Sequence, residues 1–171
     1  MYYDKIPVGK SLPDEVFAII EISSDSSPIK YEFNKEYGCL VVDRFIATGM
    51  RYPCNYGFIP HTFGGDGDPL DILVVSSYGI LPGSIVPSRP IGALVTEDEG
   101  GMDEKVIAIP VKDFEMLDVR SVTDLSSSLI KKIEHFFSNY KNMEPGKWVK
   151  VSKWIDKEET LQLIKLCLQK K

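Results

Sequence analysis

Cysteine and histidine are scarce in this sequence, and the scarcity argues against two kinds of site. The 171 residues include three cysteines, Cys39, Cys54 and Cys167, with no CxxC pair and no even set from which a disulfide framework could be built. The two histidines, His61 and His135, stand far apart, so a zinc site has little support. We expect the cysteines to be free, buried thiols.

Long hydrophobic runs are also missing. Apolar stretches such as residues 72–75 have the length of a strand, whereas a membrane-spanning helix needs about 20 apolar residues. The first ten residues, MYYDKIPVGK, have neither the apolar core nor the small-residue cleavage site of a secretory signal. With 43% hydrophobic and 26% charged residues, the composition is typical of one globular domain. We therefore expect a single domain over residues 1–171, cytoplasmic and without a membrane partner.

An overall basic charge is absent as well. The formal net charge is −5, and residues 1–130 carry 10 lysines and arginines against 20 aspartates and glutamates, whereas residues 131–171 carry 10 against 5. Proteins that hold nucleic acid usually present a basic face. The sequence thus predicts no nucleic-acid partner, and an anionic substrate chelated by metal would suit both halves.

What the chain does contain is many short β-type segments followed by helical periodicity. The segments are 16–21, 29–33, 40–45, 56–59, 70–75, 84–86, 91–96 and 106–110, most of them bounded by turn residues. Apolar residues then recur at steps of three and four from Leu125 to Tyr140, behind a capping pair at 123–124, and a second helix begins at Asp156. The pattern predicts an α+β protein, mainly β, in which a barrel or sandwich is followed by two C-terminal helices.

The most informative motif is GGDGDPLD, which places Asp66, Asp68 and Asp71 within six residues. Three ionised carboxylates this close repel one another, so a fold that keeps them together normally supplies a cation or raises a pKa. The intervening glycines and proline favour a tight, stiff turn. A calcium loop of the EF-hand type is excluded, because it needs glycine where Asp71 stands and glutamate where Ser77 stands.

Further carboxylates and cations occur in pairs along the chain. Lys30 and Glu32 are two residues apart in a predicted strand, so their side chains lie on one face. The run from Glu97 to Glu99 leads through two glycines to Asp103, and Lys105 follows two positions later. Because Mg2+ takes oxygen ligands and usually only one or two protein carboxylates, such pairs suit a multi-metal phosphate site.

Several segments together resemble one enzyme family. They are PIKYE at 28–32, VDRF at 42–45, YPCNYGFIP at 52–60, DGDPLD at 66–71 and PGKWVKV at 145–151. Over essentially the whole chain they are similar to the bacterial family I soluble inorganic pyrophosphatases. The resemblance implies a cytoplasmic, Mg2+-dependent hydrolase of inorganic diphosphate with a five-stranded OB-like β-barrel, assembled as a homohexamer of two trimers or as a trimer. Mn2+ or Zn2+ are possible substitutes for Mg2+.

The resemblance also implies roles for individual residues. Asp68 is expected to accept the proton of the attacking water. Metal binding is implied for Asp66, Asp71, Asp103, Asp98, Glu32 and Glu21. Phosphate binding is implied for Lys30, Arg44, Tyr56, Lys105, Tyr140 and Lys141, and Tyr52 is expected to line the site. At three positions the sequence departs from common family choices: Asn139, where well-known relatives carry a second histidine at the contact between trimers, Arg51 and Phe58.

Two other functions remain open at this point. A non-catalytic OB module that binds metal or single-stranded oligonucleotides would be expected to interleave aromatic and basic residues, whereas carboxylates dominate here. Hydrolysis of nucleoside triphosphates or phosphate esters stays possible as a metal-dependent side activity. The leading prediction is hydrolysis of diphosphate by direct attack of a water molecule, without a phosphoenzyme.

Overall fold

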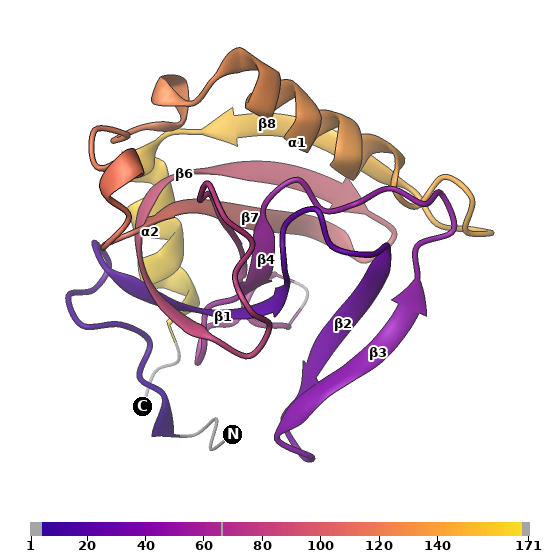
Figure 1. The fold of residues 1–171 in the computed structure, drawn as a ribbon, viewed down its shortest axis with the longest axis horizontal. Helices are drawn as coiled ribbons and strands as arrows, with labels where there is room; N and C mark the ends of the chain where they lie inside the picture. The colour runs from indigo at the N-terminus through magenta and orange to yellow at the C-terminus, as the bar shows by residue number, and fades with distance from the viewer. Residues whose placement is uncertain (1–4, 66, 169–171) are drawn as a thin grey trace.

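The computed structural model describes residues 5–65 and 67–168. Within these residues the chain forms a mainly β structure with two α-helices (Figure 1). The strands are β1 (Val16–Ile22), β2 (Ile29–Asn34), β3 (Cys39–Phe45), β4 (Asn55–Phe58), β5 (Asp71–Val74), β6 (Ile85–Asp98), β7 (Gly101–Pro110) and β8 (Val149–Ile155). The helices are α1 (Ser127–Asn139) and α2 (Lys157–Cys167), with 3₁₀ turns η2 (Phe114–Met116) and η3 (Val122–Asp124) before α1.

Strands β1, β4, β5, β7 and β6 close into a barrel. They pair in that order, and β6 returns to pair with β1. All of these pairings are antiparallel except that between β5 and β7. Numbered along the chain, the closed order is 1-2-3-5-4-1, so the expected five-stranded OB-like barrel with two C-terminal helices is confirmed.

Two local features allow the barrel to close. Strand β6 is 14 residues long and shifts its register against β7 between Pro90 and Gly92, a bulge that bends the strand so that it can reach both β1 and β7. On β4, a Cβ atom at Gly57 would lie 1.9 Å from the carbonyl oxygen of Ile19. Only glycine therefore permits the close approach of β4 to β1.

Alternate residues of the central strands pack into two apolar clusters. Ile72 and Val106 belong to a cluster that includes Ile164 of α2. Leu73 and Ile107 belong to another that includes Phe136 of α1. Since neighbouring residues on a strand point to opposite faces, both faces of β5 and β7 are covered and these strands are rigidly held.

The hairpin β2–β3 forms a separate two-stranded sheet that extends away from the barrel (Figure 1). Its most buried apolar contact is Phe33, which packs with Ile19 of β1 and Phe58 of β4, and Tyr31 and Leu40 add partly buried contacts. The other residues of β2 and β3 are half-buried or exposed. The hairpin is thus a semi-independent arm beside a closed barrel.

Three details differ from the sequence-based expectations. The segments 84–86 and 91–96 fall, except for Ser84, in one bent strand, β6. Strand β8 was not anticipated, and the alternation of its first four residues is broken at Lys153. The N-cap of α1 is Ser126, whose hydroxyl accepts the amide of Leu129, while residues 123–124 belong to η3. The cap of α2 is confirmed, since the Asp156 side chain accepts the amide of Glu159. In the part of the chain that the structure describes, no helix is long and apolar enough to cross a membrane.

Candidate active site

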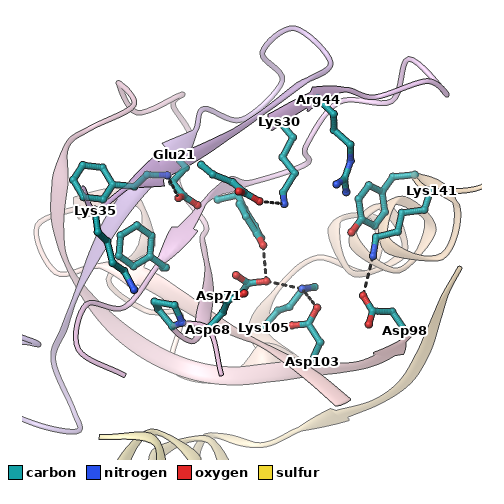
Figure 2. A pocket seen from close by; sticks show the side chains of 16 residues that line it. Glu21, Lys30, Lys35, Arg44, Asp68, Asp71, Asp98, Asp103, Lys105 and Lys141 are labelled. Atoms are coloured by element: carbon teal, nitrogen blue, oxygen red, sulfur yellow. Dashed lines mark hydrogen bonds and ion pairs between the residues drawn. The ribbon is translucent and has the colours of Figure 1, made fainter. Parts of the chain in front are cut away.

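A pocket of about 290 Å3 lies between one end of the barrel, the β2–β3 hairpin and the end of α1 (Figure 2). The barrel supplies its floor, the hairpin one wall, and the turn after α1 the other. Its lining consists of Glu21, Lys30, Glu32, Phe33, Lys35, Arg44, Tyr56, Phe58, Asp68, Pro69, Asp71, Asp98, Asp103, Lys105, Tyr140 and Lys141.

The floor is built around Lys105 on β7. Asp71, the first residue of β5, lies directly beside Lys105 in the parallel pairing, and Asp103 precedes Lys105 by two positions on the same face of β7. The Lys105 Nζ donates to Asp71 Oδ2 at 2.7 Å and to Asp103 Oδ2 at 2.8 Å (Figure 2). Tyr56 on β4 donates its hydroxyl to the same Asp71 oxygen. Polar side chains of three neighbouring strands, β4, β5 and β7, therefore meet around Asp71 and Lys105.

Lys105 is buried, with 2% of its surface exposed. Burial opposes its charge, but Asp71 and Asp103 outweigh that cost and raise the pKa of Lys105 above its usual value. Burial also raises the pKa of Asp103, although Lys105 acts in the opposite direction. The ammonium lies 5.1 Å from the centre of the Phe137 ring, a cation–π contact from the apolar core below.

The hairpin wall carries a chain of charges. Lys30 bonds to Glu32 on the same strand and lies 3.5 Å from Asp43 Oδ2 on β3. Arg44 donates from Nη1 to that Asp43 oxygen at 3.0 Å. Its Nε lies 3.2 Å from Oε1 of Glu144, which belongs to the turn after α1. The hairpin and that turn thus meet across Arg44.

The remaining wall comes from the end of α1. Lys141 donates to Asp98 Oδ2 at 2.8 Å and lies 3.7 Å from Glu99, so it ties the turn after α1 to the end of β6. Tyr140 stacks on Phe136 with 5.0 Å between ring centres, and burial raises the pKa of its phenol. Aromatic packing therefore fixes the backbone from which Lys141 reaches into the pocket.

Glu21, near the end of β1, lies where the barrel meets the hairpin. It is 8% exposed, and its Oε1 accepts the amide of Phe33 at 2.7 Å. Burial raises the pKa of its carboxyl to about 8, against the lowering effect of that hydrogen bond. A carboxylate buried to this degree is stable in its charged form only beside further positive charge.

The donor set of the pocket fits divalent metal ions. Its described lining includes six acidic side chains and five basic ones, and each of Lys30, Lys105 and Lys141 is paired with at least one carboxylate. Within residues 5–65 and 67–168 no three of the Asp, Glu, His and Cys side chains form a metal-binding group by themselves. Pairs such as Asp71 and Asp103 are sufficient for Mg2+, which fills its other positions with water and phosphate oxygens. Asp66 lies outside the described residues.

Comparison with known proteins decides the family. The family model described as inorganic pyrophosphatase matches residues 18–171. This chain belongs to the inorganic pyrophosphatase family. It is 53% identical over 156 residues to the inorganic pyrophosphatase of Pseudomonas aeruginosa, with 90% of this chain and 89% of that protein covered.

Solved structures of inorganic pyrophosphatases share the fold. The Thermus thermophilus enzyme superposes with a TM-score of 0.94 at 39% identity, covering 98% of this chain and 97% of that one. The Helicobacter pylori enzyme gives a TM-score of 0.90 at 44% identity, covering 96% of each chain. The expected family, fold and enzyme class, inorganic diphosphatase, are therefore confirmed.

Most residues to which the sequence assigned a role in this pyrophosphatase lie around the one pocket. Twelve of the fourteen line it. Tyr52 does not: it is buried behind the wall, 4.9 Å from Tyr56 and 4.5 Å from Phe136 between ring centres. Asp66 falls outside the described residues. Of the three departures from common family choices, Phe58 lines the pocket, whereas Arg51 donates to the carbonyl oxygen of Asp25.

Sequence reasoning missed three lining residues, Phe33, Lys35 and Pro69. Lys35 is five positions after Lys30, and an odd spacing on a continuous strand predicts opposite faces. The strand ends at Asn34, however, and the turn that follows carries Lys35 back to the pocket. The turn between the two predicted strands could have indicated the position of Lys35, since residues at a tight turn no longer follow strand alternation.

Proposed function

We propose that this pyrophosphatase hydrolyses inorganic diphosphate in an Mg2+-dependent reaction by direct attack of water. The observation that carries the proposal is the pocket lining, in which six carboxylates and five cations surround a space of about 290 Å3. A tetra-anionic substrate chelated by metal needs both kinds of side chain at once. A nucleic-acid module would instead present bases to aromatic and basic residues.

Metal would be held by the carboxylates of Asp71, Asp103, Asp98, Glu32 and Glu21, together with Asp66. When bound, Mg2+ would neutralise charge on the phosphates and acidify a coordinated water. The buried Glu21 carboxyl supports this placement, because its raised pKa of about 8 indicates that the charged form lacks a sufficient positive partner in the protein alone.

Asp68 is the proposed proton acceptor for the attacking water. It lines the pocket from the turn that precedes β5. That turn is braced by the Gly64 amide, which donates to the Asp68 carbonyl at 2.7 Å, and by Gly67 with a φ of 89°. The positive φ is a conformation that glycine adopts without strain, so the turn can present the carboxylate to the pocket.

The phosphates would be held by Lys30, Arg44, Tyr56, Lys105, Tyr140 and Lys141. In the protein as described, Lys105 and Lys141 are paired with carboxylates. When substrate binds, these ammonium groups would exchange carboxylate oxygens for phosphate oxygens, so that no buried cation lacks a partner in either state. The same groups would stabilise charge that develops on the leaving phosphate.

The test is phosphate release from diphosphate by purified protein. We expect release with Mg2+, weaker release with Mn2+ or Zn2+ in its place, none after chelation, and little from ATP with Mg2+. No phosphoryl group should remain on the protein when it is quenched during turnover. Absence of Mg2+-dependent release would refute the proposed function, and a phosphorylated protein would refute direct attack by water.

We also propose a cytoplasmic homohexamer or trimer. The position that distinguishes the two assemblies is Asn139, on the same face of α1 as His135. Its amide donates to the His135 carbonyl at 2.7 Å and lies 3.2 Å from His135 Nδ1, so Asn139 is engaged within its own helix. Sedimentation equilibrium separates the assemblies: a wild type with the mass of six chains is the hexamer, whereas a gain of mass in Asn139→His alone would show that the wild type is the trimer.

A further inference from the structure

Arg44 and Glu144 form an ion pair that no part of the proposed reaction explains. The Arg44 Nε lies 3.2 Å from Glu144 Oε1. Both atoms are shielded from solvent, yet neither makes a hydrogen bond of good geometry. Buried polar atoms normally make hydrogen bonds. Two such atoms that lie within hydrogen-bond distance but at an unfavourable angle therefore call for an explanation.

Backbone hydrogen bonds on both sides of Glu144 fix the position of this residue. Its amide donates to the carbonyl of Lys141 at 2.8 Å, and its own carbonyl accepts the amide of Lys147 at 3.2 Å. Lys147 in turn pairs with Glu99 at the end of β6. The turn that presents Lys141 to the pocket is therefore the same tight turn that presents Glu144 to Arg44.

Arg44 is open to solvent only in part, and its guanidinium is approached from two sides. Asp43 accepts from Nη1, and Glu144 lies against the Nε edge. Figure 2 shows the side chain pointing into the pocket between Lys30 and Lys141. An arginine held at Nε has little freedom to swing about its long side chain, and its terminal nitrogens stay where a phosphate can meet them in the paired geometry that guanidinium favours.

We propose that Glu144 is a positioning residue that holds the Nε edge of Arg44 so that its terminal nitrogens engage the bound diphosphate. This inference rests on the proposed role of Arg44 in phosphate binding. The misaligned contact of the free protein becomes a proper hydrogen bond when phosphate draws the guanidinium into line. Glu144 itself touches neither substrate nor metal.

Single variants give the first test. In Glu144→Ala we expect kcat/KM for diphosphate to fall about tenfold, in the middle of the range for coupled neighbours. Glu144→Gln keeps an acceptor oxygen for Nε and should stay within about threefold of wild type. The matched control is Glu158→Ala, an exposed glutamate on α2, which should leave activity unchanged. A Glu144→Gln variant as impaired as Glu144→Ala would overturn the positioning role.

A double-mutant cycle separates positioning from a general structural effect. Lysine has no Nε–H edge, so in an Arg44→Lys background the change Glu144→Ala should alter kcat/KM by less than about twofold. A loss in that background as large as in the wild type would overturn the inference. So would a fall of the melting temperature that appears equally in both backgrounds and accounts for the lost activity.

The two proposals fail in distinguishable ways. If Arg44→Ala retains wild-type kinetics with diphosphate, the proposed role of Arg44 in phosphate binding is wrong, and the inference about Glu144 falls with it. If Arg44→Ala is impaired while Glu144→Ala is not, the proposed function stands and only the positioning role is overturned. The affinity for the product phosphate can be measured from the rise in melting temperature that phosphate causes. This affinity should be lower in Glu144→Ala but unchanged in Glu158→Ala.

Discussion

The two sides of the pocket are built differently. On the barrel side, the Lys105 side chain is 3% exposed and its partners Asp71 and Asp103 are 23% and 24% exposed. On the hairpin side, Lys30 is 18% exposed and its partner Glu32 is 51% exposed. The barrel floor belongs to a closed sheet with apolar clusters on both faces, whereas the hairpin is a two-stranded arm.

The difference indicates a division of labour. Groups on the floor are fixed before substrate arrives, which suits the electrostatic stabilisation of a transition state. Groups on the hairpin are held at a few points, among them the Glu21 bond to the Phe33 amide and the Arg44 contact with Glu144. Sparse attachment lets a segment move at low cost, so we expect the hairpin to be the more mobile side of the pocket.

The largest expected effect lies at Asp68, beside the floor. Asp68→Asn keeps the shape of the side chain but cannot accept a proton, so kcat should fall by about 10²- to 10⁴-fold, the usual contribution of a general base. Circular dichroism should show the wild-type fold. Asp118→Asn, at an exposed aspartate before η3, is the matched control. A kcat within tenfold of wild type would assign the proton to another group.

Stability measurements provide a direct contrast between floor and hairpin. Lys105→Met removes a buried cation from between two carboxylates and should lower the free energy of unfolding by about 3–5 kcal/mol, as for other broken buried pairs. Lys30→Met breaks a more exposed pair and should cost less than about 1 kcal/mol. Urea unfolding in the absence of Mg2+ measures both. Equal costs would mean that the two sides are equally well packed.

Local spacing predicts charged pairs on both sides of the pocket, and on the hairpin it brings Lys30 and Glu32 to one face. Spacing by two on a strand brings Asp103 and Lys105 to one face, and the glycine-rich turn before Asp71 marks the charged motif. What local patterns do not contain is the parallel pairing of β5 with β7, which sets Asp71 beside Lys105 across 34 residues. The barrel type and the individual roles came from family resemblance, since periodicity alone left barrel and sandwich open.

The contacts between the hairpin and the turn after α1 could not be predicted from the sequence. Glu144 lies 100 positions from Arg44, and its pairing depends on how the arm leans against that turn. Tyr52 shows the reverse case, because the family resemblance implied a place at the site, whereas its ring packs against that of Tyr56 and it is not among the pocket lining. Local rules fix which face a residue occupies, whereas tertiary packing decides what that face meets.

Metal binding should reduce the difference in mobility between the hairpin and the barrel floor. At about one hundred times its dissociation constant, Mg2+ should raise the free energy of unfolding by about 2.7 kcal/mol, and chelation should reverse the gain. Because Glu32 of the hairpin and Asp71 of the floor are proposed to serve the same group of ions, hydrogen exchange of β2 and β3 amides should slow more than that of β5 amides. Stabilisation without added protection of the hairpin would exclude Glu32 from metal binding, and Glu32→Gln should show that behaviour.

The smallest expected effect is that of labelling the cysteines. Cys39 lies in the hairpin and Cys54 in the barrel, so a thiol reagent reports on the two regions separately. Cys54 is buried in the barrel core, as expected, and burial raises the pKa of its thiol to about 12. The expectation of a buried thiol is wrong for Cys39, which is exposed at the start of β3. A thiol reagent attacks thiolate, so at pH 8 we expect rapid modification of Cys39 and none of Cys54 until the protein unfolds.

The raised pKa of Cys54 also fixes the sign of its effect on stability. Above pH 9.0, the usual value, an unfolded chain releases the proton that the folded protein keeps, so the contribution of Cys54 to stability is lost as pH rises toward about 12. Labelling of Cys39 at pH 8 should change kcat by less than about twofold, because an exposed side chain outside the pocket lining adds little to either state. Cys39→Ser should abolish the rapid phase. Because Cys167 of α2 is a partly buried free thiol, the comparison is made in a Cys167→Ser background. A rapid phase that persists there after Cys39→Ser would mean that the barrel opens as readily as the hairpin, and that the contrast between them is wrong.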